Sequence, residues 1–301
     1  MYHRARPRGG RAVVPYHRFQ AHRGRVTALT YAEEGNVLVS AGTDGMVRFW
    51  DAANGRSRGE WRVESGVTCM ALSPSGTRLV IGARRGGCSV WSYPEGARLA
   101  TMANHNRPVA TVDVAPSGRI VASASYNGTV RLWDIDDCEE IESISNDRRR
   151  TAGAIFSPGG QYLVTNGFGG AVGVWTVPGL ELLRAAHCHE TAVYPPVFSP
   201  DGLMMATHGL DFQVRFWSTD EWTFAGSVTL SDRSDLRIAF GADPARLFAV
   251  SERSVWEIDP GAGTVTSHRR LRTARASSLG VSPHGETLSV GTRSGEVLLL
   301  A

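Results

Sequence analysis

The chain has 301 residues, of which 42% are hydrophobic and 20% are charged, and its formal net charge is +3. This is the composition of a soluble globular protein, and no apolar run reaches the roughly 18 residues that a membrane-spanning helix needs. All 32 basic residues are arginine, which excludes enzymes that depend on a lysine, such as P-loop nucleotidases, protein kinases and Schiff-base enzymes.

The N-terminal segment and the cysteines indicate the cellular location of the protein. Residues 1–11 contain four arginines with Pro7, Gly9 and Gly10, and they lack the apolar stretch of a secretory signal. We expect a flexible basic tail over residues 1–11 and one domain over residues 12–301. The cysteines form no CxxC pair, which favours reduced thiols and a cytoplasmic location; they are Cys69, Cys88, Cys138 and Cys188.

Tryptophan recurs along the chain at nearly constant spacing. The steps are 41, 42, 42, 42 and 39 residues, and a seventh segment ending at Leu300 follows; the tryptophans are Trp50, Trp91, Trp133, Trp175, Trp217 and Trp256. A period of about 40 residues is typical of repeated units that cannot bury their own apolar faces and cover one another instead.

Each repeat predicts the same elements in the same order. A turn such as Ser73-Pro74-Ser75-Gly76 joins the first two β-rich segments. A second turn such as Thr43-Asp44-Gly45 precedes a short strand that ends in the tryptophan, as in Met46-Val47-Arg48-Phe49-Trp50. One period therefore holds four strands and three tight turns, so we predict an all-β chain of seven four-stranded antiparallel sheets.

These residues resemble the WD-40 repeat family, whose name is spelled out at Trp50-Asp51 and Trp133-Asp134. The resemblance covers nearly the whole chain and implies a seven-bladed β-propeller. In that family a histidine, a serine or threonine, an aspartate and the tryptophan of one blade form a buried hydrogen-bonded tetrad. The matching residues are His22, Ser40, Asp44 and Trp50 in repeat one, His189, Thr207, Asp211 and Trp217 in repeat five, and His105, Ser123 and Trp133 in repeat three.

Other repeats depart from this pattern. Repeat three has Asn127 in place of the acid, and repeat two has Ile81 and Arg85 at the serine and aspartate positions. The family also implies how the ring closes. The segment 12–18 lies where an outermost strand would precede repeat one, so we expect it to complete the last blade and cover its open edge.

The residues also admit a catalytic interpretation. His22, Ser40 and Asp44 are the residue types of a hydrolase triad, but the same set recurs in repeat five, and the family pattern assigns the hydroxyl to the indole. His187, Cys188 and His189 are too few ligands for a closed zinc site. We therefore predict no enzyme activity, no metal and no cofactor. The alternatives are a propeller enzyme of the lactonase or quinoprotein kind, and nucleic-acid binding through the arginines.

The arginines collect in particular loops. In this family the loop before the first strand of a blade and the loop before the tryptophan strand open onto one rim, here called the top rim. Acidic residues collect in the loops of the opposite rim. We predict a partner-binding face on the top rim, formed by Arg84, Arg85, Arg107, Tyr126, Arg148, Arg149, Arg150, Phe168, Arg253 and Arg293. The predicted function is a scaffold that binds an acidic or phosphorylated segment of another protein.

Overall fold

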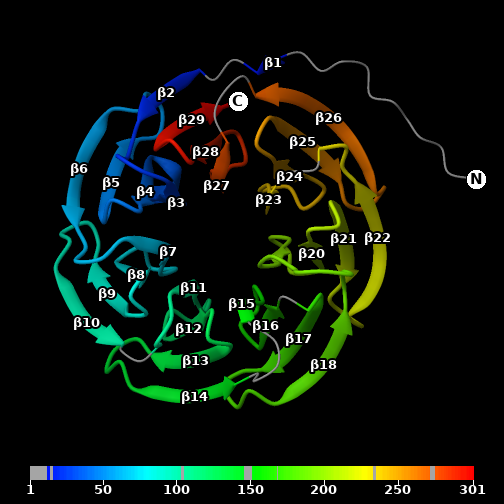
Figure 1. Ribbon diagram of the computed structural model, residues 1–301, viewed down its shortest axis with the longest axis horizontal. Helices are drawn as coiled ribbons and strands as arrows, with labels where there is room; N and C mark the ends of the chain where they lie inside the picture. The colour runs from blue at the N-terminus through cyan, green and yellow to red at the C-terminus, as the bar shows by residue number, and fades with distance from the viewer. Residues whose placement is uncertain are drawn as a thin grey trace, which may run out of the picture.

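The computed structural model describes residues 12–13, 16–102, 105–145, 151–167, 169–232, 235–271 and 275–301. The predicted tail over residues 1–11 lies outside them. Figure 1 shows the sheets arranged as blades of a ring around a central axis. The described residues form seven sheets of four antiparallel strands, one of which has a short parallel fifth strand at its edge, and one short 3-10 helix, η1 (Glu33–Gly35). The predicted seven-bladed propeller and its all-β class are confirmed.

The first four blades follow one another along the chain. Blade one contains β3 (Val26–Ala32), β4 (Val37–Gly42), β5 (Met46–Asp51) and β6 (Ser57–Arg62). Blade two contains β7 (Val67–Leu72), β8 (Arg78–Ala83), β9 (Cys88–Ser92) and β10 (Arg98–Met102). Blade three contains β11 (Val109–Val114), β12 (Ile120–Ser125), β13 (Thr129–Asp134) and β14 (Glu140–Ser145). Blade four contains β15 (Thr151–Phe156), β16 (Tyr162–Gly167), β17 (Ala171–Thr176) and β18 (Leu182–His187).

The last three blades complete the ring. Blade five contains β19 (Val197–Phe198), β20 (Met204–His208), β21 (Gln213–Ser218) and β22 (Thr223–Thr229). Blade six contains β23 (Arg237–Phe240), β24 (Leu247–Val250), β25 (Ser254–Asp259) and β26 (Thr264–Leu271). Blade seven contains β27 (Ala276–Val281), β28 (Leu288–Thr292), β29 (Glu296–Leu300) and, from the other end of the chain, β2 (His17–Gln20). No helix among the described residues is long and apolar enough to cross a membrane.

Burial changes from the inner to the outer strands of a blade. In blade one every residue of β4 is buried, whereas β6 alternates between exposed and half-buried residues. The turn between β4 and β5 needs a glycine at Gly45, whose φ of +74° is left-handed. A Cβ on this glycine would also lie 3.0 Å from the carbonyl oxygen of Val63. The β4–β5 turn at the top rim is therefore closely packed against Val63.

The N-terminal segment closes the ring in two steps. β2 pairs antiparallel with β29, from His17 opposite Leu299 to Gln20 opposite Glu296, and β1 (Ala12–Val13) pairs in parallel with β26 of blade six. In Figure 1 the blue β2 lies beside the red β29. The single outer strand predicted over residues 12–18 is therefore wrong in its bounds, because this segment pairs with two blades in turn. The predicted completion of the last blade by an N-terminal strand is confirmed.

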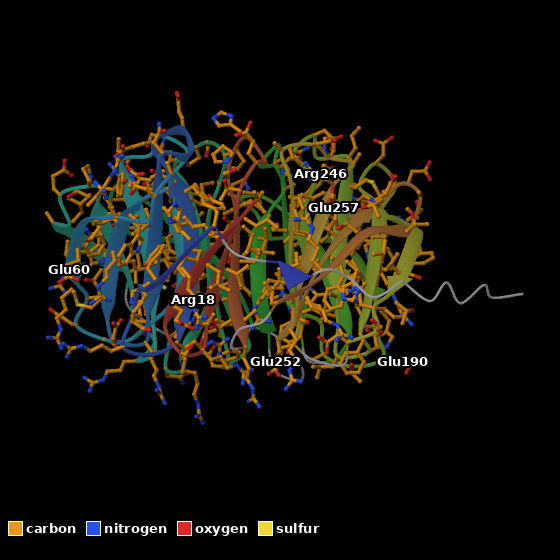
Figure 2. The ribbon with its side chains drawn as sticks, turned by 90° about the horizontal axis from the view of Figure 1, so that it is seen from above. Arg18, Glu60, Glu190, Arg246, Glu252 and Glu257 are labelled. Carbon is orange, nitrogen blue, oxygen red and sulfur yellow. The ribbon has the colours of Figure 1, made fainter. Side chains whose placement is uncertain are left out.

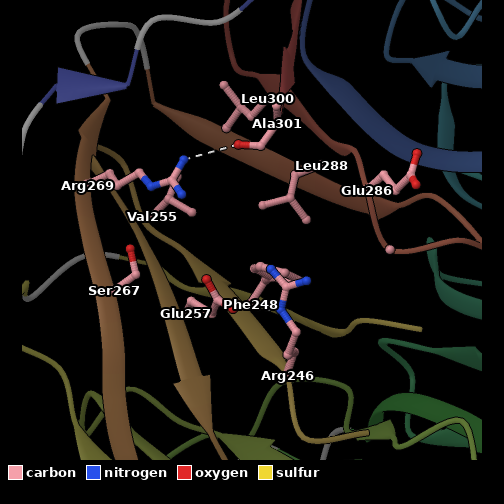
Figure 3. Close-up of a pocket in the computed structure, with 11 residues that line it drawn as sticks. Arg246, Phe248, Val255, Glu257, Ser267, Arg269, Glu286, Leu288, Leu300 and Ala301 are labelled. Atoms are coloured by element: carbon pink, nitrogen blue, oxygen red, sulfur yellow. Dashed lines mark hydrogen bonds and ion pairs between the residues drawn. The ribbon is translucent and has the colours of Figure 1, made fainter. Parts of the chain in front are cut away.

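In blades one to six, the tryptophan packs into the seam with the preceding blade. Trp91 stacks on Trp61 of blade one with ring centroids 5.0 Å apart, and Trp50 lies 4.6 Å from Phe19 of β2. At the seam between blades six and seven, Leu300 stands at the tryptophan position. A cavity of about 50 Å³ opens there between Phe248, Val255, Leu288 and Leu300 (Figure 3).

Candidate partner-binding rim

The four tetrad residues of blade one meet inside the blade. Trp50 Nε1 donates to Ser40 Oγ at 2.8 Å, and the same oxygen lies 2.8 Å from His22 Nε2. The other ring nitrogen of His22 lies 2.9 Å from Asp44 Oδ1. This pattern is satisfied when the serine donates to Nε2 and Nδ1–H donates to the carboxylate. The serine hydroxyl is thus engaged on both sides, and the histidine is neutral.

Blade five repeats this geometry. Thr207 Oγ1 lies 2.9 Å from His189 Nε2 and accepts from Trp217 Nε1 at 3.0 Å, and Asp211 lies 2.9 Å from His189 Nδ1. Burial lowers the pKa of both tetrad histidines, although the neighbouring carboxylates act to raise it. Burial acts to raise the pKa of Asp44, but hydrogen bonds from His22 and Arg48 outweigh it and lower this pKa to about 2.

Blade three replaces the carboxylate by a relay of neutral groups. His105 Nε2 lies 2.8 Å from Ser123 Oγ, which accepts from Trp133 Nε1 at 2.9 Å. His105 Nδ1 lies 2.9 Å from Thr129 Oγ1, which in turn donates to Asn127 Oδ1 at 2.7 Å. Burial lowers the pKa of His105 to about 4. The asparagine at the acid position therefore acts through Thr129, a residue that the sequence analysis did not assign.

An arginine two residues before the tryptophan joins the tetrads of blades one and five. Arg48 Nη1 lies 3.0 Å from Asp44 Oδ2 and donates to the carbonyl oxygen of Ala21 at 2.9 Å. Arg215 contacts Asp211 and the carbonyl oxygen of Cys188 in the same way. The sequence indicates this role of the two arginines, because the strands Val47-Arg48-Phe49-Trp50 and Val214-Arg215-Phe216-Trp217 share the same pattern. These arginines support the tetrad and are not available to a partner.

Blade two keeps its tryptophan but not the tetrad. Ile81 occupies the serine position and is fully buried. Trp91 Nε1 donates instead to Ser89 Oγ, two residues earlier on the same strand, at 2.7 Å. Arg85, at the aspartate position, is exposed. The β8–β9 turn of this blade is therefore free to carry charged side chains.

In blades two, three and six, the described residues of the top rim include arginines without a counter-charge. Glu190 and Glu252, from two loops of this rim, lie along the lower edge in Figure 2, whereas Arg246 and Glu257 lie toward the upper edge. Four top-rim arginines are exposed and form no side-chain ion pair or hydrogen bond within the described part of the chain; they are Arg84, Arg85, Arg107 and Arg253. Tyr126, in the β12–β13 turn, is 46% exposed.

Four residues of the predicted face, Arg148, Arg149, Arg150 and Phe168, lie outside the described residues. Arg293, another residue of the predicted face, is described and is held by a carboxylate. Its Nη2 lies 2.9 Å from Asp235 Oδ2. Arg275 lies 3.3 Å from Glu252 in the same way. Asp235 and Glu252 thus place two acids on the top rim, in loops of blade six, and the expectation that acid collects on the opposite rim stays a prediction.

On the opposite rim, four arginines are matched with acids, whereas the exposed Arg56 has no side-chain ion pair or hydrogen bond among the described residues. Arg78 lies 2.6 Å from Asp136, and Arg119 lies 3.0 Å from Asp134. Arg58 pairs with Asp51 at 2.7 Å, and Arg246 pairs with Glu257 at 2.6 Å. The two rims thus differ in how many of their arginines are paired with acids.

Other reactive groups give no second site among the described residues. No group of three or more His, Cys, Asp or Glu side chains there is placed to hold a metal ion. The four cysteines are free. Burial raises the pKa of Cys69 and of Cys188 to about 12, so these thiols are protonated at neutral pH.

Comparison with known proteins identifies the repeat. The family model "WD domain, G-beta repeat" matches residues 13–51, 57–92 and 96–134. WD repeat-containing protein dyf-2 of Caenorhabditis elegans is 33% identical over 99 residues, which are 30% of this chain and 7% of that protein. Eukaryotic translation initiation factor 3 subunit I of Bombyx mori is 27% identical over 88 residues, which are 29% and 27% of the two chains.

A third relative is the p21-activated protein kinase-interacting protein 1-like of Xenopus laevis, 33% identical over 63 residues, which are 21% of this chain and 17% of the relative. The chain thus matches 27% or less of the length of each of these three relatives. Three repeats that match the family model, together with seven blades of the expected form, make the chain similar to the WD-40 repeat family and support a place for it there.

Proposed function

We propose that this protein is a non-catalytic scaffold whose top rim binds an acidic or phosphorylated segment of a partner protein. WD-40 propellers are generally protein-interaction scaffolds, and the Xenopus relative is named for a protein that it binds. The observation that carries the proposal is the unequal pairing of arginines on the two rims. Arg84, Arg85 and Arg107 are exposed and unpaired among the described residues, whereas Arg58, Arg78 and Arg119 are held by carboxylates.

The chemistry of these side chains suits an anionic segment. A guanidinium group donates two parallel hydrogen bonds to a carboxylate or phosphate, which an ammonium group cannot do. An exposed ion pair contributes only about 0–1 kcal/mol, so useful affinity also needs a contact that excludes water. Tyr126 lies on the same rim in blade three and offers an exposed ring for that contact. A cytoplasmic location, which the four free cysteines fit, is part of this proposal.

Two triple variants with the same change in charge test which rim binds the partner. Arg84→Ser/Arg85→Ser/Arg107→Ser removes the unpaired top-rim arginines, and Arg58→Ser/Arg78→Ser/Arg119→Ser removes paired arginines of the opposite rim. Tagged wild-type protein and both variants are compared by quantitative affinity purification, and the rate at which each recovered partner associates is measured at two salt concentrations. We expect the top-rim variant to lose partners and its association rate to fall about tenfold, with wild-type binding weaker at high salt.

The opposite-rim variant is expected to keep these partners. Loss of partners in this variant alone would show that the opposite rim is the working face. Treatment of the lysate with phosphatase separates a phosphorylated from an acidic segment, since only the first loses binding.

A further inference from the structure

A second group of side chains, which includes Arg293 of the predicted face, lies beside the inner strands of the propeller. Four consecutive blades contribute one side chain each, beside the innermost strands β23, β27 and β3 (Figure 1). Arg237 begins β23, Arg293 follows β28, and Arg25 directly precedes β3. Tyr194 precedes β19 of blade five. We call Arg25, Arg237, Arg293 and Tyr194 the inner arginine cluster.

Hydrogen bonds between blades hold the cluster in place. Arg237 Nε donates to the carbonyl oxygen of Ser277 at 3.1 Å, and Ser277 Oγ donates at 2.7 Å to the carbonyl oxygen of Val26, the residue after Arg25. On the other side, the guanidinium carbon of Arg237 lies 5.4 Å from the centre of the Tyr194 ring. That ring is stacked on His208 with centroids 4.9 Å apart. Arg237 is therefore positioned by blades five and seven together.

The positive charges of the cluster exceed the negative ones. Asp235 accepts hydrogen bonds from Tyr194 Oη at 3.0 Å and from Arg293 Nη2 at 2.9 Å, so both of its oxygens are engaged. Arg237 donates to two carbonyl oxygens, which carry no net charge. The Nε of Arg25 is buried and has no hydrogen-bond partner among the described residues. Of the three guanidinium groups, only that of Arg293 contacts a carboxylate within the described part of the chain.

This arrangement favours an additional anion. Burial, and then the nearby charge of Arg25, lower the pKa of Arg237, as is usual where a partly buried cation lacks a counter-charge. Buried charges and buried N–H groups without partners are unfavourable, and a bound anion would satisfy both. Forked N–H donors that come from separate blades suit the several oxygens of a tetrahedral oxyanion.

We propose that the inner arginine cluster binds a phosphate-type oxyanion, with Arg25 and Arg237 supplying the unmatched charge and Arg293 a further set of donors. The Tyr194 ring and its hydrogen bond to Asp235 define one wall of the site. The site goes beyond the proposed function because Arg293 is its only member of the predicted face, and it contains none of Arg84, Arg85, Arg107 or Tyr126. The two sites can therefore succeed or fail separately.

Binding is tested on the full chain with inorganic phosphate as the probe. Thermal melts and isothermal titration calorimetry are run at constant ionic strength with sodium phosphate, sodium acetate or phosphoserine against sodium chloride. We expect the midpoint of melting to rise by about 2 °C or more once phosphate exceeds its dissociation constant about tenfold. Acetate is expected to give no comparable shift. Phosphoserine acting like phosphate would indicate a phosphomonoester as the natural ligand, and phosphate alone would indicate a free anion.

Three variants locate the bound anion. Arg25→Met removes a guanidinium whose Nε donates no hydrogen bond, so we expect it to fold and to bind phosphate about tenfold more weakly or worse. Arg237→Met is expected to weaken binding at least as much, and the exposed rim variant Arg84→Met is expected to bind like the wild type. The proposal is overturned if phosphate does not bind the wild type, if acetate binds equally well, or if Arg25→Met binds phosphate normally. Loss of binding in Arg84→Met alone would place the anion on the rim.

Discussion

At the scale of single residues, polar groups inside each blade are satisfied by one another. Ser40 accepts from an indole and donates to a histidine, and Asp44 binds that histidine and Arg48. A buried donor or acceptor that loses its partner costs about 1–3 kcal/mol, and a charged group costs more. The tetrad therefore stabilises the blade only as a complete set, and the aspartate holds both its histidine and the neighbouring Arg48.

The first prediction concerns this aspartate. Asp44→Ala leaves the ring of His22 without an acceptor and leaves Arg48 without its buried partner, so we expect a loss of about 2–4 kcal/mol in the free energy of unfolding. Arg85→Ala changes the exposed residue at the aligned position of blade two, and we expect a change within about 0.5 kcal/mol. Urea denaturation of both variants measures the difference. Equal stability would show that the hydrogen bonds of Asp44 contribute nothing net.

The members of the tetrads could be predicted from sequence, whereas their neighbours could not. His22, Ser40, Asp44 and Trp50 recur at fixed spacing in blade five, which made them visible. Thr129 occurs beside an asparagine in one blade only, so no repetition marked it as a relay. Ser89 takes over the indole because it lies two residues before Trp91 on the same strand. Whether Thr129 or Ser89 can replace a tetrad partner depends on the direction of its side chain. The repeat spacing of about 40 residues carries no information on that direction.

At the scale of elements, the seam between blades six and seven differs from the others. Leu300 pairs with Leu288 in the ladder, as Trp50 pairs with Leu38 and Trp133 pairs with Val121. Leu300 thus stands where an indole fills the seam in other blades. Its side chain is smaller than an indole, and a cavity lies beside it. Val290 occupies the position of the serine acceptor, so an indole placed here would bury an unpaired N–H.

The second prediction uses this difference. Leu300→Phe fills the cavity without adding a polar group, and we expect about 1 kcal/mol of additional stability. Leu300→Trp is expected to gain less because its N–H lacks an acceptor, and Leu300→Trp/Val290→Ser is expected to recover the difference. Leu299→Phe makes the same chemical change at a fully buried neighbour, where overpacking is expected to cost about 1–3 kcal/mol. Thermal melts rank the four variants, and a destabilised Leu300→Phe would contradict the cavity argument.

At the scale of the whole molecule, the number of blades was predictable and the contacts between blades were not. The recurrence of tryptophan counts six repeats, and the segment that ends at Leu300 adds the seventh. The bounds of the closing strand depend on pairing with β29 and β26, which lie more than 200 residues away in the chain. The charge of the rims depends on ion pairs between blades, such as that of Arg78 in blade two with Asp136 in blade three. Counting charges by loop could therefore not show which arginines are paired.

The last prediction concerns closure of the ring. Deletion of residues 1–20 removes β2, so the edge of β29 loses its ladder and Trp50 loses the ring of Phe19. The lost apolar contact and the unpaired backbone groups predict a decrease on the order of 3 kcal/mol in stability. An exposed edge strand also pairs readily with another chain, so dimers or larger species are expected by size-exclusion chromatography. Deletion of residues 1–11 leaves both β1 and β2 and serves as the control, with stability and size like those of the full chain. Equal melting midpoints for the two truncated chains would show that β2 adds little to closure, and a loss already complete in the shorter deletion would assign the stabilisation to residues 1–11.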